Sequence, residues 1–131
     1  MRIRPVLKRL KKGFTLIELI IVMAIVSLLL TLAAPRYFRS IERSKETVLK
    51  ANLASTRDAL DKYYSDTGKY PEQLIDLVNQ RYLRTLPWDP ITESSDTWTV
   101  TPPPGGQAGA VYNIYSGAQG AGSNQIPYAE W

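Results

Sequence analysis

One carboxylate lies inside a long apolar segment near the start of the chain. Residues 14–34 contain a single charged side chain, that of Glu18, which follows the residues Gly13-Phe14-Thr15-Leu16-Ile17. An acid at the centre of a membrane helix costs roughly 2.5–3.5 kcal/mol, so such a residue needs a role and a partner. If the chain is cut between Gly13 and Phe14, the new α-amino group lies four residues before Glu18 and supplies a positive charge.

The amine and the carboxylate can pair in two ways. Within one helix they lie about one turn apart. Between two parallel subunits with an axial stagger, Glu18 of one subunit meets the amine of Phe14 on the next. The second pairing would set the register of an assembly, which is the best-attested use of a buried polar group.

The residues Gly13 to Glu18 resemble the prepilin processing motif of type IV pilins and type II secretion pseudopilins. The resemblance implies that a membrane peptidase cuts after Gly13 and methylates the new N-terminal Phe14. It also implies that Glu18 directs subunit docking. Pro35, the twenty-second residue counted from Phe14, falls where that family commonly has a proline, so the resemblance makes it an assembly candidate together with Phe14 and Glu18.

The apolar segment and its flanks indicate a membrane protein. At about 1.5 Å per residue, a helix over residues 14–34 spans roughly 31 Å, enough for the hydrocarbon core. A secretory signal has a shorter apolar region of about 7–15 residues. The leader, residues 1–13, has no acid and predicts a cytoplasmic N-terminus. It carries six of the 16 basic residues, namely Arg2, Arg4, Lys8, Arg9, Lys11 and Lys12.

Composition excludes several functions. After Gly13 the chain has 10 basic and 12 acidic side chains, a balance of −2, so no nucleic-acid partner is expected. There is no Cys and no His, which removes disulfides, thiolate metal sites and the commonest catalytic base. No Gly-rich phosphate loop lies between a strand and a helix. We therefore expect that this protein is not an enzyme.

One long helix is predicted from Phe14 to about Ser65, with a kink near Pro35 because proline removes a backbone bond. Gly68 suits a left-handed cap that ends it. Beyond the proline an apolar stripe recurs at helical spacing, through Ile41, Val48, Leu49, Leu53, Leu60, Tyr63 and Tyr64. Charges of both signs lie mostly off the stripe and indicate a solvated face: Arg43, Lys45, Glu46, Lys50, Arg57, Asp58, Asp61 and Lys62.

The remaining sequence predicts a small α+β domain. A short helix is expected from Tyr70-Pro71-Glu72, then an irregular connection over 82–90 in which Asp89 orients a turn. Strands over 97–101 and 110–115 predict an antiparallel β-hairpin that packs on the second half of the long helix. Residues 116–131 read as an irregular loop. The tryptophans Trp88, Trp98 and Trp131 are expected in the core.

This order of elements looks like the major pseudopilin of type II secretion, the G type. The fold implied is pilin-like: a leader over 1–13, a transmembrane and filament-core helix over 14–34, and a soluble domain over 35–131. The resemblance implies an inner-membrane protein with one span and a periplasmic domain. It assembles with copies of itself, and its partners are minor pseudopilins, a prepilin peptidase, the inner-membrane assembly platform and, before assembly, lipid.

Two other functions stay open. The chain could be a major or minor type IV pilin, acting in adhesion, motility or DNA uptake. It could also be a membrane-tethered binding module that forms no filament. Cleavage with methylation at Phe14, and contacts between subunits, distinguish these possibilities.

The resemblance also implies a calcium ion in the loop that follows the hairpin. Residues 116–126 contain no acid, and Gln119 and Asn124 stand where the family pattern has aspartates. Calcium prefers charged oxygen ligands, and this loop offers only neutral ones. The calcium candidates are therefore weak, namely Ser116, Gln119 and Asn124. We expect the loop to be held instead by hydrogen bonds and by Tyr128 and Trp131, with no cofactor.

Overall fold

The computed structural model describes residues 2–3 and 12–131. The predicted leader lies largely outside the described residues, including its basic residues Arg4, Lys8, Arg9 and Lys11. The chain divides into two compact units, Met1–Phe38 and Arg39–Trp131.

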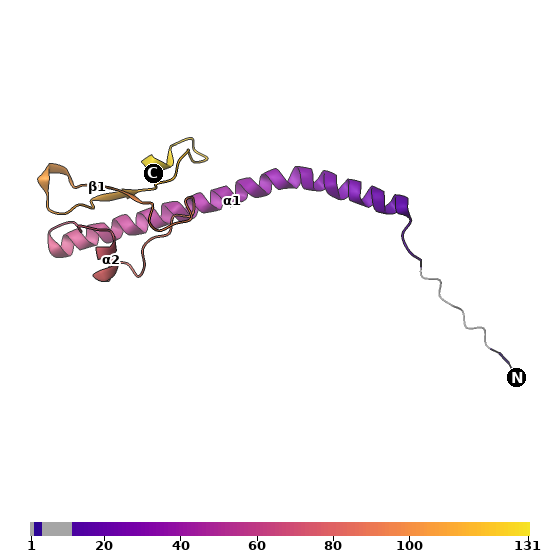
Figure 1. The fold of residues 1–131 in the computed structure, drawn as a ribbon, viewed down its shortest axis with the longest axis horizontal. Coiled ribbons are helices and arrows are strands. Elements are labelled where there is room, and N and C mark those ends of the chain that lie inside the picture. Colours follow the sequence, from indigo (N-terminus) through magenta and orange to yellow (C-terminus); the bar gives the residue numbers. More distant parts are fainter. Residues whose placement is uncertain (1, 4–11) are drawn as a thin grey trace. The chain divides into compact units, whose positions relative to one another are not determined.

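Helix α1 runs from Leu16 to Thr67, 52 residues, and enters both units (Figure 1). The predicted bounds differ from these by two residues at each end, which is the usual uncertainty of helix termini. Pro35 lies inside the helix. The kink predicted there stays a prediction.

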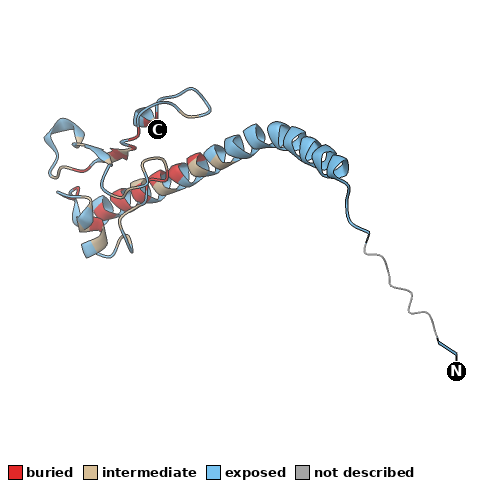
Figure 2. Cartoon of the chain, turned by 45° about the vertical axis from the view of Figure 1, so that its right-hand side comes forward, coloured by how far each residue is buried: buried red, intermediate tan, exposed pale blue. Residues whose placement is uncertain are grey.

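The first unit presents its apolar side chains outward. Every residue from 14 to 34 is exposed, and the first part of α1 has a mean hydropathy of 2.8 (Figure 2). The polar residues of this stretch bond back to their own helix: Ser27 donates to the Met23 carbonyl and Thr31 to the Ser27 carbonyl, both at 2.8 Å. By length and composition, this part of α1 is able to cross a membrane.

The second unit has the core. Leu49, Leu53 and Leu60 of α1 are at most 2% exposed, and they pack with residues from the rest of the unit, including Leu77 and Ile114. The predicted stripe is right at its centre and wrong at its margins. Val48 and Tyr64 are exposed, whereas Thr56 and Ala59, which the predicted stripe left out, are buried. A stripe read from apolar residues alone misses small residues on the buried face.

Gly68 ends α1 in the left-handed conformation, with φ of 73°, and its N–H donates to the Tyr64 carbonyl at 2.8 Å. This confirms the predicted cap. The next helix, α2, spans Ile75–Asn79, so the prediction that it starts at Tyr70 is wrong. Tyr70 and Pro71 instead bond across to residues 108–111: the Tyr70 N–H donates to Ala108, and the Pro71 carbonyl accepts from Ala110 and Val111.

The predicted hairpin is present but shorter. Strand β1, Thr99–Thr101, pairs antiparallel with β2, Asn113–Tyr115, with Val100 opposite Ile114. Residues 110–111, predicted as strand, instead donate their N–H groups to the Pro71 carbonyl. Short 3₁₀ turns, η1 over Pro104–Gly106 and η2 over Tyr128–Glu130, complete the α+β pilin-like fold.

Trp98 and Trp131 pack against the core, as predicted, but Trp88 is 51% exposed. Trp88 follows Pro87 in the irregular connection, and its backbone carbonyl, not its ring, meets the helix by accepting a hydrogen bond from Asn52 at 2.6 Å. The ring is thereby left on the surface.

Candidate functional site

The start of α1 holds the predicted processing and assembly residues. Gly13 and Phe14 precede the helix outside any regular secondary structure, and Phe14 is 90% exposed. A Cβ added at Gly13 would meet nothing within 4 Å. Nothing within the described part of this chain therefore requires glycine at position 13. If glycine is required there, the reason must be a partner that approaches the backbone.

Glu18 is engaged with Thr15 at the helix start. The Thr15 N–H donates to Oε2 of Glu18 at 3.4 Å, and the Glu18 N–H donates to Oγ1 of Thr15 at 3.2 Å. These are the two reciprocal bonds of a capping box, in which Thr and Glu three residues apart satisfy free backbone donors. The spacing Thr-x-x-Glu is the signal that could have predicted this cap, and sequence reasoning missed it by considering only the charge of Glu18.

The third assembly candidate, Pro35, is not brought to this place. It lies 17 residues beyond Glu18 along α1, about 25 Å at 1.5 Å per residue. Glu18 and Phe14 are neighbours at the helix start, whereas Pro35 lies far along the helix from both.

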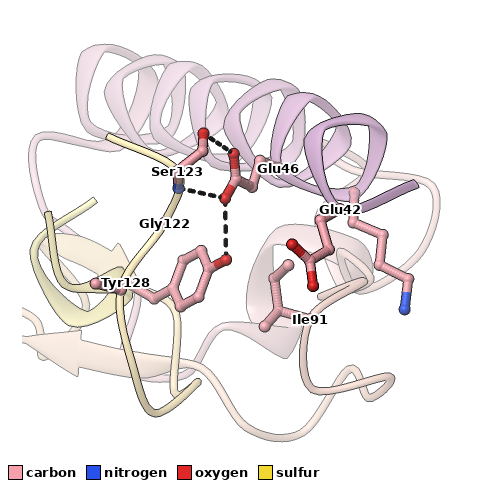
Figure 3. Close-up of a pocket in the computed structure, with 8 residues that line it drawn as sticks. Glu42, Glu46, Ile91, Gly122, Ser123 and Tyr128 are labelled. Carbon is pink, nitrogen blue, oxygen red and sulfur yellow. Dashed lines mark hydrogen bonds between the residues drawn. The ribbon is translucent and has the colours of Figure 1, made fainter. Parts of the chain in front are cut away.

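A second site lies in the other unit, where a carboxylate of α1 meets the loop over residues 116–131, here called the terminal loop. Glu46 is only 6% exposed, so its predicted place on a solvated face is wrong. Its Oε1 accepts from the Ser123 N–H at 2.7 Å and from the Tyr128 hydroxyl at 3.1 Å, and its Oε2 accepts from the Ser123 hydroxyl at 2.6 Å (Figure 3). Three donors of the terminal loop thus converge on one carboxylate.

These contacts decide the protonation of the group. Burial raises the pKa of Glu46, but the bonds from Ser123 and Tyr128 and the nearby charge of Lys50 bring that pKa below its ordinary value of 4.5. The charged form is therefore the one that the site stabilises. The pKa of Tyr128 is raised, first by burial and then by its bond to Glu46, so its hydroxyl stays a donor.

Arg57 attaches the terminal loop at a second point. Its Nη2 donates to the carbonyls of Ile114 at 2.8 Å and Trp131 at 2.5 Å, and its Nε donates to Oδ1 of Asn113 at 2.7 Å. Glu46 and Arg57 are 11 residues apart, about three helical turns, so they lie on one face of α1. Arg57 was also predicted to be solvated, and it is half-buried.

Asp89 holds the beginning of the terminal loop. It is 0% exposed; its Oδ1 accepts from the N–H groups of Ile91 and Thr92, which confirms that it orients a turn. Its Oδ2 accepts from the Ser116 hydroxyl at 2.5 Å, and Oγ of Ser116 accepts in turn from the Ala118 N–H. Ser116, a calcium candidate, is therefore committed to Asp89.

The other calcium candidates are placed apart from this network. Gln119 is exposed, and Oδ1 of Asn124 accepts from the Ile126 N–H within its own turn. Among residues 2–3 and 12–131 there is no group of three His, Cys, Asp or Glu side chains that could hold a metal. The two carboxylates that reach the loop, those of Glu46 and Asp89, accept hydrogen bonds from it. A loop that turns N–H and O–H groups toward a carboxylate does not fit calcium, which takes six to eight oxygen ligands.

The comparisons with known proteins agree with this picture of the chain. Residues 8–34 match the family described as the prokaryotic N-terminal methylation motif. Type II secretion system core protein G of Aeromonas hydrophila is 31% identical over 99 residues, covering 63% of this chain and 69% of that protein. Its counterpart in Xanthomonas campestris pv. campestris is 34% identical over 68 residues, covering 52% of this chain and 48% of that protein.

A fimbrial protein of Eikenella corrodens, EcpC, is 35% identical over 85 residues, covering 61% of this chain and 56% of that protein. The chain thus spans about half the length of the EcpC and Xanthomonas relatives. No solved structure matches the chain significantly.

Proposed function

The chain belongs to the type IV pilin-like family of type II secretion system core protein G, and we propose that it forms a pseudopilus that drives protein export. It is a pilin-like filament subunit and not an enzyme, as its relatives are pilins and secretion core proteins. The role in export is the proposal.

The observation that carries the proposal is that the apolar first part of α1 is not covered by any other part of the described chain. Residues 14–34 are exposed along their whole length and contain one acid. Apolar surface of that extent needs a cover. Lipid covers it before assembly, when the segment anchors the subunit, and neighbouring copies cover it afterwards in the filament core.

Processing prepares the subunit for this exchange. A prepilin peptidase cuts after Gly13 and methylates Phe14 on the cytoplasmic side of the inner membrane, while residues 35–131 lie in the periplasm. Gly13 and Phe14 are exposed and lie outside regular secondary structure, which suits a peptidase that must reach the backbone. The inner-membrane assembly platform and minor pseudopilins then receive the processed subunit.

Glu18 directs the docking step. In the membrane its carboxylate has the Thr15 N–H as a local partner. In the filament it pairs with the amine of Phe14 on a neighbouring copy. Because a buried charge without its partner is costly, only the axial stagger that joins the two groups is stable. The charge pair therefore selects the register of the growing filament.

The test replaces Glu18 by an apolar residue. In a strain with Glu18→Val as its only copy, we expect a processed protein in the membrane, shown by mass spectrometry, and no filaments by electron microscopy. Ile17→Val is the matched control, because it alters a neighbouring side chain and keeps the acid. Normal filament numbers in the Glu18→Val strain would contradict the proposal, since an anchor that only tolerates an acid predicts no assembly defect.

The similarity to a fimbrial protein favours a second candidate, a type IV pilus subunit. Both candidates form filaments, so the experiment must measure what the filament does: protein export for a pseudopilus, or surface pili with adhesion and motility for a pilus. Deletion of the gene should abolish export of secreted proteins and leave surface pili, adhesion and motility unchanged if the first proposal holds. The reverse result assigns the chain to a pilus. A tethered binding module would form no filaments in the electron micrographs of the wild-type strain.

A further inference from the structure

The terminal loop is fastened to the rest of its unit through charges of other segments. Its internal backbone bonds are short-range, as in the pairing of Ala121 with Pro127 and the Gln125 N–H on Gly122. Such local bonds shape the loop but do not tie it to α1. Besides the packing of Ala118, Tyr128 and Trp131 at the core, polar attachment to α1 comes from Glu46 in the middle of the loop and from Arg57 at Trp131.

The polarity of the Glu46 contact is the reverse of that in a metal-held loop. A cation gathers acceptors, that is, carbonyl and carboxylate oxygens. Here the loop turns donors inward, namely the N–H and O–H of Ser123 and the O–H of Tyr128, and an anion from the helix gathers them. Charge-assisted bonds of this kind are short and about twice as strong as neutral ones.

We infer that the Glu46 carboxylate closes the terminal loop in place of a divalent cation, so that the subunit folds without calcium. The inference rests on the proposed function, because it concerns the folded subunit that enters a filament. It deepens that function by stating that this subunit needs no calcium, although the resemblance implies a calcium ion in the loop.

Both oxygens of Glu46 already accept hydrogen bonds from the terminal loop, which argues against a metal ion beside them. The cavity next to the carboxylate, about 330 Å³, is also lined by Glu42, Lys45 and Ile91. The ammonium group of Lys45 lies 3.7 Å from the carboxylate of Glu93. Lys45 is the one cation among these lining residues, and its positive charge offsets part of the attraction that Glu42 and Glu46 exert on a divalent cation.

The experiment measures how often the terminal loop opens in the unassembled full-length protein in detergent. Hydrogen exchange of peptides from 116–131, followed by mass spectrometry, reports the free energy of opening. For the wild type we expect the same exchange rate in calcium and in EDTA. A loop held by calcium at 100 times its Kd would instead exchange about 100-fold more slowly in calcium than in EDTA. That result would overturn the inference.

Variants test the carboxylate itself. Glu46→Gln should raise loop exchange about tenfold or more, the factor that corresponds to about 1.4 kcal/mol. Tyr128→Phe removes one donor and should give a smaller rise in a fold that stays intact. Glu42→Gln is the matched control, because it changes a glutamate one turn away in the same cavity and should leave exchange unchanged.

Equal exchange in Glu46→Gln, Glu42→Gln and the wild type would also overturn the inference. Since the readout uses unassembled subunits, a failure here is distinct from a failure to form filaments, which the Glu18 experiment scores separately.

Discussion

Arg57 gives the clearest quantitative prediction, because one side chain joins three segments of the second unit. Its guanidinium donates to Asn113 and Ile114 of β2 and to Trp131 of the terminal loop. It also lies over the ring of Tyr115, with 5.4 Å from Cζ to the ring centroid. Arg57→Lys keeps the charge but replaces a planar fork by a single ammonium group.

The expected loss follows from the bonds that lysine cannot make. A hydrogen bond from a charged group contributes about 1.5–3 kcal/mol. If the substituted lysine retains one of the three bonds, two are lost, and the lower end of that range gives about 3 kcal/mol. A domain has about 5–15 kcal/mol of stability in total, so this change is large.

Urea unfolding of the full-length protein in detergent, followed by near-ultraviolet circular dichroism, measures the loss. At a slope of about 1–3 kcal/mol per molar, the midpoint should fall by about 1–3 M. Lys62→Met is the control: its exposed pair with Asp58, at 3.1 Å, contributes about 0.3–0.5 kcal/mol. If both variants shift the midpoint equally, the three bonds of Arg57 do not hold the unit together.

Three further predictions test other features. The folded-state pKa of Glu46 is below its ordinary value of 4.5, so its stabilising effect is full above that pH and is lost as the pH falls through the folded-state pKa. The urea midpoint of the wild type should therefore exceed that of Glu46→Gln at about pH 7, and the difference should shrink at about pH 3; a constant difference would contradict this. Gly117→Ala should destabilise the second unit strongly, because its Cβ would overlap the Thr97 carbonyl oxygen, whereas Gly120→Ala meets no atom within 4 Å and its effect is limited to its positive φ. Equal melting temperatures for these two variants would refute the clash. Gly13→Val should leave the leader attached, and mass spectrometry that finds N-methylated Phe14 in this variant would refute the role of Gly13 in processing.

Local features of the chain could be predicted from the sequence alone. The apolar run over 14–34, the stop at Gly68 and the α+β order depend on neighbouring residues, whose periodicity and backbone preferences act over a few positions. The motif from Gly13 to Glu18 is likewise a matter of short spacing, and the same holds for the turn at Asp89. These expectations agree with the structure and the family.

The terminal loop could not be predicted in this way. In the sequence, Glu46 and Arg57 look the same as Lys62: each is a charge beside an apolar stripe. The sequence therefore predicts all three on the solvated face. What distinguishes them is a partner 77 residues away for Glu46, in Ser123, and 74 residues away for Arg57, in Trp131. Periodicity tells which face of a helix a residue occupies. Whether a charge on that face is buried depends on which distant segment folds over it, and that is settled only when the hairpin and the loop pack on α1.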